Sequence, residues 1–146
     1  MTVLFVCTGS VSRSAVAECI LRNMAERAGR TDITVASAGV HNLFGQPYDP
    51  QMIATAAKYG YHMEGNSRQM TQEMLLQADF IFAMERYHCV QIQKELPYAQ
   101  WYKLHQITQY CYGDEFNIED PLYSDAEYDF SFHQIESCCK IILNRI

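Results

Sequence analysis

Short apolar runs alternate along the chain with longer segments in which apolar residues recur every three or four positions. The runs are rich in β-branched and aromatic residues and show no alternation, a pattern typical of strands buried on both faces. They predict strands at residues 3–6, 33–38 and 80–84, with a fourth near 101–104. The segments with the 3.6-residue period predict helices over 14–28, 50–58, 85–96 and a C-terminal stretch after residue 125.

Strands separated by helices indicate an α/β fold built from βαβ units. We expect a three-layer molecule, with a four-stranded parallel twisted sheet, helices on both faces, and residues 1–146 forming a single domain. In such sheets the functional crevice lies beyond the carboxyl ends of the strands. Cys7 ends the first strand and the acidic loop 113–125 follows the fourth. The topology therefore brings together two segments that are more than about 100 residues apart.

The composition narrows the class of protein. Of 146 residues, 49% are hydrophobic and 19% charged, which suits a globular chain with a sizeable core. The apolar runs are too short for a membrane span, and the first ten residues lack the basic flank of a secretory signal, so we expect a cytoplasmic protein. A net charge of −6 argues against a nucleic-acid partner.

Six cysteines are present, but none forms a C-x-x-C pair, and none stands at metal-ligand spacing from a histidine. In a reducing compartment they are expected to remain thiols. We expect neither a metal ion nor another cofactor.

The segment from Cys7 to Ser14 carries the clearest chemical signal, a C-x5-R-S pattern between the first strand and the first helix. A loop of small residues before a helix directs backbone N–H groups inward and forms an anion site. Arg13 supplies a planar fork that matches two oxygens of a phosphate. The loop predicts a phosphate-binding site whose contacts come from Thr8, Gly9, Ser10, Val11, Ser12 and Ser14.

Cys7 lies at the base of this loop, where the same positive field favours a thiolate. A thiolate beneath a bound phosphate is an in-line nucleophile at phosphorus. The Ser14 hydroxyl can donate to the sulfur and improve it as a leaving group. This arrangement predicts catalysis through a phosphocysteine.

Such chemistry needs an acid for the leaving group and then a base for water. Asp120 is the best candidate, because Pro121 stiffens its loop and seven acidic residues from Asp114 to Asp129 favour a protonated fraction. Tyr123, and Leu43 with Phe44 in the loop after the second strand, are candidates for the substrate wall. Leu43 and Phe44 fit a small core cluster beneath that loop equally well.

Together these segments resemble the low-molecular-weight protein tyrosine phosphatases, in order and over nearly the whole chain. The resemblance is carried by residues 3–18, by Ser37-Ala38-Gly39 with Asp49-Pro50, by residues 67–69 and 83–84, and by Asp120-Pro121 with Tyr123. It implies that Cys7 is the nucleophile, Arg13 the phosphate clamp and Asp120 the acid and then base, with Ser37 behind the loop. The spacing from Ser37 to Pro50 resembles the bacterial members, which often act on tyrosine kinases, so phosphotyrosine proteins are the implied partners.

Several positions depart from the family pattern. Ser10 stands where the family usually has Asn, and Gly65 lies near the position of a His in the same bracing network, which implies a differently supported loop. Ser12 replaces a second cysteine that can form a protective disulfide. Thr8 and Leu122 replace larger apolar or aromatic residues beside the substrate ring.

Three alternatives remain open from the sequence. A phosphocysteine carrier would use the same strand, loop and helix, although Arg13 favours hydrolysis over simple transfer. A weakly active relative that binds phosphotyrosine fits the changes at Ser10 and Gly65. An arsenate reductase needs two further cysteines after the third strand, and only Cys89 is found there.

Overall fold

The computed structural model describes residues 1–42 and 45–146, and its centre is a sheet of four parallel strands. The strands lie in the order β2-β1-β3-β4, with Leu4 of β1 opposite Ala36 of β2 and Ile81 of β3. Their bounds are β1 Thr2–Cys7, β2 Thr34–Gly39, β3 Phe80–Ala83 and β4 Leu104–Gln106.

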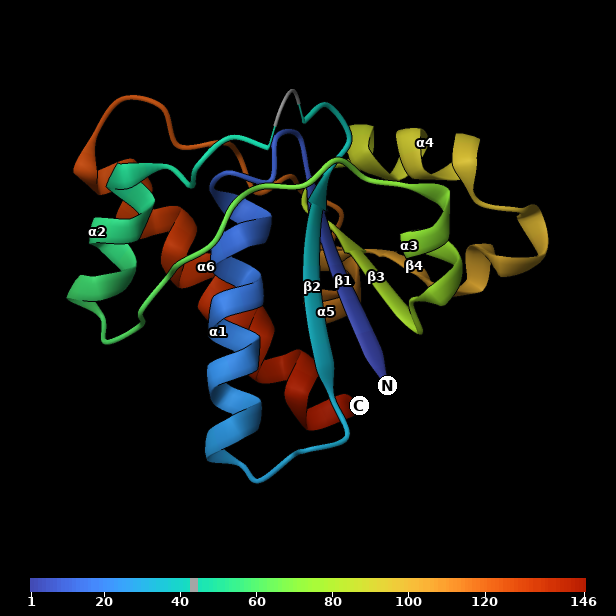
Figure 1. The fold of residues 1–146 in the computed structure, drawn as a ribbon, viewed down its shortest axis with the longest axis horizontal. Helices are drawn as coiled ribbons and strands as arrows, with labels where there is room; N and C mark the ends of the chain where they lie inside the picture. The colour runs from blue at the N-terminus through green and yellow to red at the C-terminus, as the bar shows by residue number, and fades with distance from the viewer. Residues whose placement is uncertain (43–44) are drawn as a thin grey trace.

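Helices cover both faces of this sheet (Figure 1). Helices α1, α2, α5 and α6 pack on one face, and α3 and α4 pack on the other. Their bounds are α1 Arg13–Arg27, α2 Pro50–Lys58, α3 Gln72–Gln77, α4 Arg86–Glu95, α5 Ile107–Tyr112 and α6 Asp125–Arg145, with a 3-10 helix, η1, at Tyr98–Lys103. The expected three-layer α/β fold is confirmed.

The side chains of strand β1 alternate between two apolar clusters, one on each face of the sheet. Val3 and Phe5 belong to the cluster beneath α1 and α6, whereas Leu4 and Val6 belong to the cluster beneath α3 and α4, and all four are essentially inaccessible to solvent. Burying each large apolar side chain stabilises the fold by about 1.5–3 kcal/mol. The unbroken apolar run in the sequence therefore reflects burial on both faces.

The long helix α6 turns one apolar stripe toward the core, as its 3.6-residue apolar period predicts. Ser124 caps its first turn by accepting a hydrogen bond from the Glu127 N–H, 3.2 Å away. The stripe that faces the core consists of Tyr128, Phe132, Ile135, Cys139 and Ile142, all buried. Helix α2 begins at Pro50, as predicted, and the Asp49 side chain caps it by accepting a hydrogen bond from the Gln51 N–H at 3.0 Å.

The fourth strand is a correction to the sequence-based prediction. Residues 98–103 form η1, and the strand begins only at Leu104. Pro97 precedes η1, and the Trp101 Nε1–H donates to the Leu96 carbonyl at 2.8 Å, so the aromatic run is folded back as a tight turn. Helices α3 and α5 were missed, because six residues are too few to establish an apolar period.

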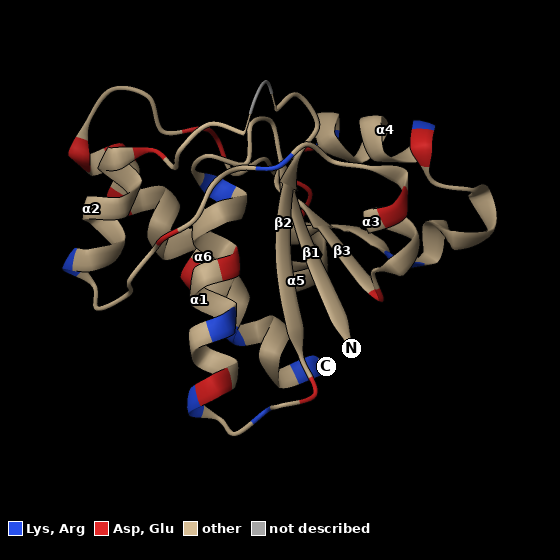
Figure 2. Ribbon diagram, in the orientation of Figure 1, with Lys and Arg blue, Asp and Glu red and all other residues tan. Residues whose placement is uncertain are grey.

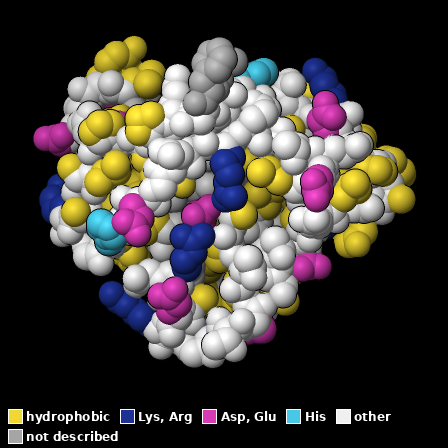
Figure 3. Space-filling model, viewed as in Figure 1, with side chains coloured by type: hydrophobic (Ala, Val, Ile, Leu, Met, Phe, Trp, Pro, Cys, Tyr) yellow, Lys and Arg dark blue, Asp and Glu magenta, His cyan; other side chains and the backbone are white. Residues whose placement is uncertain are grey.

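Charge is spread unevenly over the elements. Figure 2 shows both basic and acidic residues along α1, whereas the segment leading into α6 carries acidic residues. On the face that includes α1, acidic and basic side chains are interleaved in Figure 3. Within the described ranges, no helix has both the length and the apolar character needed to cross a membrane.

Candidate active site

The carboxyl ends of β1, β2 and β3 meet beneath the loop that joins β1 to α1, residues 8–12, called here the phosphate loop (Figure 1). Backbone hydrogen bonds tie this loop to the segment after β2, from the Val40 N–H to the Cys7 carbonyl at 3.0 Å and from the His41 N–H to the Thr8 carbonyl at 2.8 Å. Because the strand order reverses beside β1, this loop lies at the position where open α/β sheets bind ligands.

Cys7 lies at the bottom of the loop with only 2% of its surface exposed. Its Sγ is 3.0 Å from the Ser14 Oγ, and it accepts hydrogen bonds from the backbone N–H groups of Ser10 at 3.3 Å and Ser14 at 3.5 Å. The two backbone donors favour negative charge on the sulfur, and the Ser14 hydroxyl, which also lies 3.4 Å from the Ala38 carbonyl, is close enough to donate to a thiolate, the contact that the sequence predicts.

Arg13 is buried beside the loop, and its guanidinium has two different sides. Nη1 donates to the Ile118 carbonyl at 2.8 Å and to the Glu85 carboxylate. Nη2 makes only a long 3.4 Å contact with the Thr8 Oγ1, and Nε has no hydrogen-bond partner among the described residues. The Ser12 hydroxyl is also buried without a partner there. Buried donors are rarely left unpaired, so the unpaired Arg13 Nε and Ser12 hydroxyl are consistent with a loop that binds an anion.

Asp120 reaches the site from the segment before α6. Its Oδ1 lies 3.7 Å from the Arg13 Nε, and its side chain is 45% exposed. Burial raises the pKa of the Asp120 carboxyl, Arg13 opposes this shift, and Asp49 and Glu85 add to it. The direction is the one predicted from the acidic run, but desolvation is its first cause.

Ser10 is the one residue other than glycine with a left-handed backbone in the described ranges, at φ 58°. Its hydroxyl donates to the Ser37 Oγ at 3.4 Å, and Ser37 in turn donates to the Glu18 carboxylate at 3.0 Å. Glu18 also pairs with Arg22 at 2.8 Å and Arg68 at 3.5 Å. The Glu18 carboxylate is thus buried behind the loop.

Two residues that the sequence did not single out also contact the site, Glu85 and His88. Glu85 binds Arg13, and the His88 Nε2 lies 2.9 Å from the Thr8 Oγ1. A signal was available, because Glu85 comes almost directly after a buried strand and the carboxyl ends of parallel strands converge.

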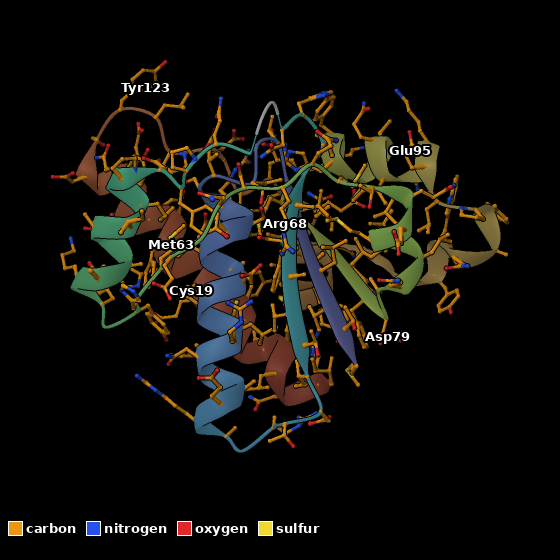
Figure 4. The ribbon with its side chains drawn as sticks, viewed as in Figure 1. Cys19, Met63, Arg68, Asp79, Glu95 and Tyr123 are labelled. Atoms are coloured by element: carbon orange, nitrogen blue, oxygen red, sulfur yellow. The ribbon has the colours of Figure 1, made fainter. Side chains whose placement is uncertain are left out.

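Of the residues predicted to form the substrate wall, only Tyr123 lies within the described ranges. Tyr123 is 84% exposed, and Figure 4 shows it pointing outward from the loop before α6. With Asp120, Leu122 and Phe130 it lines a cavity of about 270 Å³. Leu43 and Phe44 fall outside the described residues. The described ranges contain no cluster of three or more His, Cys, Asp or Glu side chains arranged to hold a metal ion.

Comparison with known proteins identifies the family. The family model for low molecular weight phosphotyrosine protein phosphatases matches residues 2–146. The chain belongs to this family. Low molecular weight phosphotyrosine protein phosphatase 2 of Drosophila melanogaster is 30% identical over 149 residues, covering 99% of this chain and 91% of that protein.

Solved structures of this phosphatase family share the whole fold. The low molecular weight phosphotyrosine phosphatase of Vibrio cholerae O395 superposes with a TM-score of 0.91 at 31% identity, covering 99% of this chain and 95% of that one. A YwlE arginine phosphatase, as a C7S mutant with a phosphorylated active site serine, superposes at 0.89 with 25% identity, covering 99% and 95%. This chain is thus a phosphatase of the low molecular weight class.

Proposed function

We propose that this phosphatase hydrolyses phosphotyrosine, an aryl phosphate monoester, through a phosphocysteine intermediate and without a metal ion. The observation that carries the proposal is the Nε–Nη2 edge of the buried Arg13, where Nε has no hydrogen-bond partner among the described residues, beside a loop whose donors converge on the Cys7 sulfur. This edge can bind two phosphoryl oxygens while Nη1 stays held by Glu85 and Ile118.

In the first step the Cys7 thiolate attacks phosphorus, and the bond from phosphorus to the tyrosyl oxygen breaks. Asp120 gives its proton to that oxygen, which leaves as a phenol, and Arg13 binds the equatorial oxygens as charge spreads over them. The raised pKa of Asp120 supports this role, because it retains a proton at higher pH than an ordinary carboxyl.

In the second step the Asp120 carboxylate takes a proton from water, and the water oxygen attacks the phosphocysteine. The sulfur–phosphorus bond breaks, inorganic phosphate leaves, and the electron pair returns to Cys7 as a thiolate. The Ser14 hydroxyl, 3.0 Å from the sulfur, stabilises this leaving group. The phosphorylated active site serine in the C7S relative supports phosphoryl transfer to this position.

Phosphotyrosine-containing proteins are the proposed partners, tyrosine kinases among them, as for the bacterial members that the chain resembles. We place the reaction in the cytoplasm, because a thiolate nucleophile and six free cysteines require a reducing compartment. We further propose that residues 1–146 act as one domain without a nucleic-acid partner, in keeping with the net charge of −6.

Steady-state kinetics on phosphotyrosine and phosphoserine peptides, with and without a metal chelator, test the proposal. We expect turnover of the phosphotyrosine peptide only, unchanged by chelator, inhibited by vanadate, and absent in Cys7→Ser. Activity retained in Cys7→Ser contradicts the covalent mechanism. Rapid transfer of phosphate from Cys7 to a partner protein favours a carrier, and binding without turnover favours a recognition module.

Phosphoarginine is a second candidate substrate, favoured by the likeness to an arginine phosphatase and by the carboxylates around the site. Asp49 and Glu85 lie close enough to Asp120 to help raise its pKa, and a group of carboxylates attracts a guanidinium group. A phosphoarginine peptide in the same assay distinguishes the two. A higher kcat/KM for it than for phosphotyrosine would replace the aryl phosphate proposal.

A further inference from the structure

A buried histidine of α4 contacts the phosphate loop from outside the catalytic set. His88 has no solvent exposure, and its Nε2 lies 2.9 Å from the Thr8 Oγ1, which comes directly after Cys7 in the chain. The contact joins the α4 side of the sheet to the mouth of the site. Nothing in the proposed catalytic steps uses it.

The hydrogen bonds of His88 determine its tautomer. The Glu85 backbone N–H donates to the Nδ1 at 3.1 Å, so Nδ1 carries no proton. Burial, together with the nearby Arg13 charge, lowers the pKa of His88 to about 4, and the ring is therefore neutral at ordinary pH. The single ring proton is on Nε2, and His88 is the donor to Thr8.

The Thr8 hydroxyl consequently has its acceptor capacity filled. It accepts from the His88 Nε2 and, at 3.4 Å, from the Arg13 Nη2. A hydroxyl has two acceptor lone pairs and one hydrogen, so that hydrogen must point elsewhere. Among the described residues, no acceptor receives it. The second hydrogen on Arg13 Nη2 has no acceptor among the described residues and belongs to the edge proposed to bind the phosphoryl group, so the Thr8 hydroxyl would lie beside that group.

We propose that His88 is a positioning residue that orients the Thr8 hydroxyl so that it donates to an oxygen of the bound phosphoryl group. The proposal rests on the proposed function of the site, which supplies that group. Thr8 would thereby add a side-chain donor to the backbone donors of the loop. His88 itself would touch neither the substrate nor the reacting atoms.

Binding of inorganic phosphate, measured as its inhibition constant in the aryl phosphate assay, tests this role. Loss of one donor to an anion weakens binding by about tenfold. We expect Thr8→Val and His88→Leu each to raise the inhibition constant by about that factor, and the double variant to be no worse than either. His88→Gln, whose amide can still donate to Thr8, should recover most of the affinity.

A matched control comes from the second histidine whose pKa is lowered by burial. His105 of β4 packs against Phe82 and Tyr110 and has no contact with the loop. His105→Leu should leave the phosphate inhibition constant unchanged, even if it alters the midpoint of thermal unfolding. An equal rise in His105→Leu and His88→Leu would overturn the proposal, because general loosening would then explain both.

Other results would also contradict it. Additive effects of Thr8→Val and His88→Leu would show that the two residues act separately, and an unchanged inhibition constant in Thr8→Val would remove the donor role. If His88→Leu does not fold, the inhibition constant of Thr8→Val still tests the donor role of Thr8. Nitrogen NMR of the folded enzyme provides a reading independent of activity, since a proton on the His88 Nδ1 would exclude the assigned tautomer. Failure of the wild-type protein to bind phosphate would contradict the proposed function as well.

Discussion

At the scale of single residues, the main feature of the site is that the two edges of the Arg13 guanidinium have different surroundings. One nitrogen is anchored by Glu85 and the Ile118 carbonyl, whereas at the opposite edge Nη2 makes only a long contact with Thr8 and the buried Nε has no hydrogen-bond partner among the described residues. Lysine has no such two-sided geometry, because an ammonium is a point charge without a fork. The cost of leaving a buried donor unpaired is recovered only when an anion binds.

The acid role of Asp120 predicts a dependence on the leaving group. With Asp120→Ala, kcat/KM should fall by about 10²–10⁴-fold for alkyl or poorly acidic phenyl phosphates, because their oxygen needs a proton as it leaves. It should change little for nitrophenyl phosphate, whose phenolate leaves unaided. A plot of log kcat/KM against the leaving-group pKa measures this, and parallel lines for the two enzymes would rule out the acid role.

The raised pKa of Asp120 also predicts how stability changes with pH. The folded state holds this proton more tightly than the unfolded chain, so the free energy of unfolding falls as pH rises from the ordinary carboxyl range through the raised pKa. Asp120→Asn removes this penalty. Its thermal midpoint should exceed that of the wild type at pH 7 and match it at pH 3, and the reverse order would refute the assigned shift.

Ser10 tests the strain in the phosphate loop. Its left-handed backbone costs a residue other than glycine about 1–2 kcal/mol, and the Ser37 contact returns part of that. Ser10→Gly should therefore keep the free energy of unfolding within about 1 kcal/mol of the wild type, while Ser10→Val, which is β-branched, should lose about 2 kcal/mol. Urea unfolding measures both, and equal stability of the two variants would contradict the strain.

At the scale of elements, the phosphate loop depends on how closely β2 approaches it. Gly39 ends β2, and a Cβ atom there would lie 2.6 Å from the Thr8 carbonyl oxygen and 2.6 Å from the Gly9 carbonyl carbon. Both neighbours are backbone atoms, which cannot rotate away as a side chain can. The end of one strand therefore sets the shape of the loop after another.

Gly39→Ala should consequently damage the site as well as the fold. We expect phosphate affinity to fall by more than about tenfold, because the loop donors must shift from their positions. Gly29→Ala is the matched control, since its added Cβ meets nothing within 4 Å and only its φ of +70° is unfavourable. That variant should lose about 1 kcal/mol of stability and keep its phosphate affinity. Equal affinities in the two variants would show that the close approach is unimportant.

At the scale of the whole molecule, the loop lies between two separate apolar clusters. Cys7 belongs to the cluster that includes α1 and α6, whereas Val6, one residue earlier, belongs to the cluster beneath α3 and α4. Both layers must therefore be in place before the loop is held. We therefore expect the loop to be ordered only when the whole sheet and both helix layers are folded.

Oxyanion binding should accordingly stabilise the entire fold. A ligand at 100 times its dissociation constant adds about 2.7 kcal/mol, which corresponds to a rise of roughly 5–10 °C in the thermal midpoint for a chain of this size. Thermal unfolding with and without vanadate measures the shift, which a metal chelator should not alter. Arg13→Lys should lose most of the rise, and an undiminished rise in that variant would contradict the fork as the main clamp.

The sequence was sufficient to predict an element where the burial of that element leaves a clear pattern in consecutive residues. The strands 3–6 and 80–84 were predicted correctly within a residue or two, because burial on both faces leaves unbroken apolar runs. The position near 101–104 was not, because a three-residue strand next to a turn has too little pattern to define its start. The C-x5-R-S segment likewise predicted a loop between β1 and α1 with Cys7 at its base, and its anion-binding role stays a prediction.

By itself, then, the order of residues determined the layers of the fold, the phosphate loop and the candidates Cys7, Arg13 and Asp120. Only the tertiary structure brought Glu85 against Arg13, His88 against Thr8 and Glu18 behind Ser37. Those contacts join residues from different strands and helices. Which residues meet in these contacts depends on how the elements pack in space. The spacing of residues along a single element does not determine that packing.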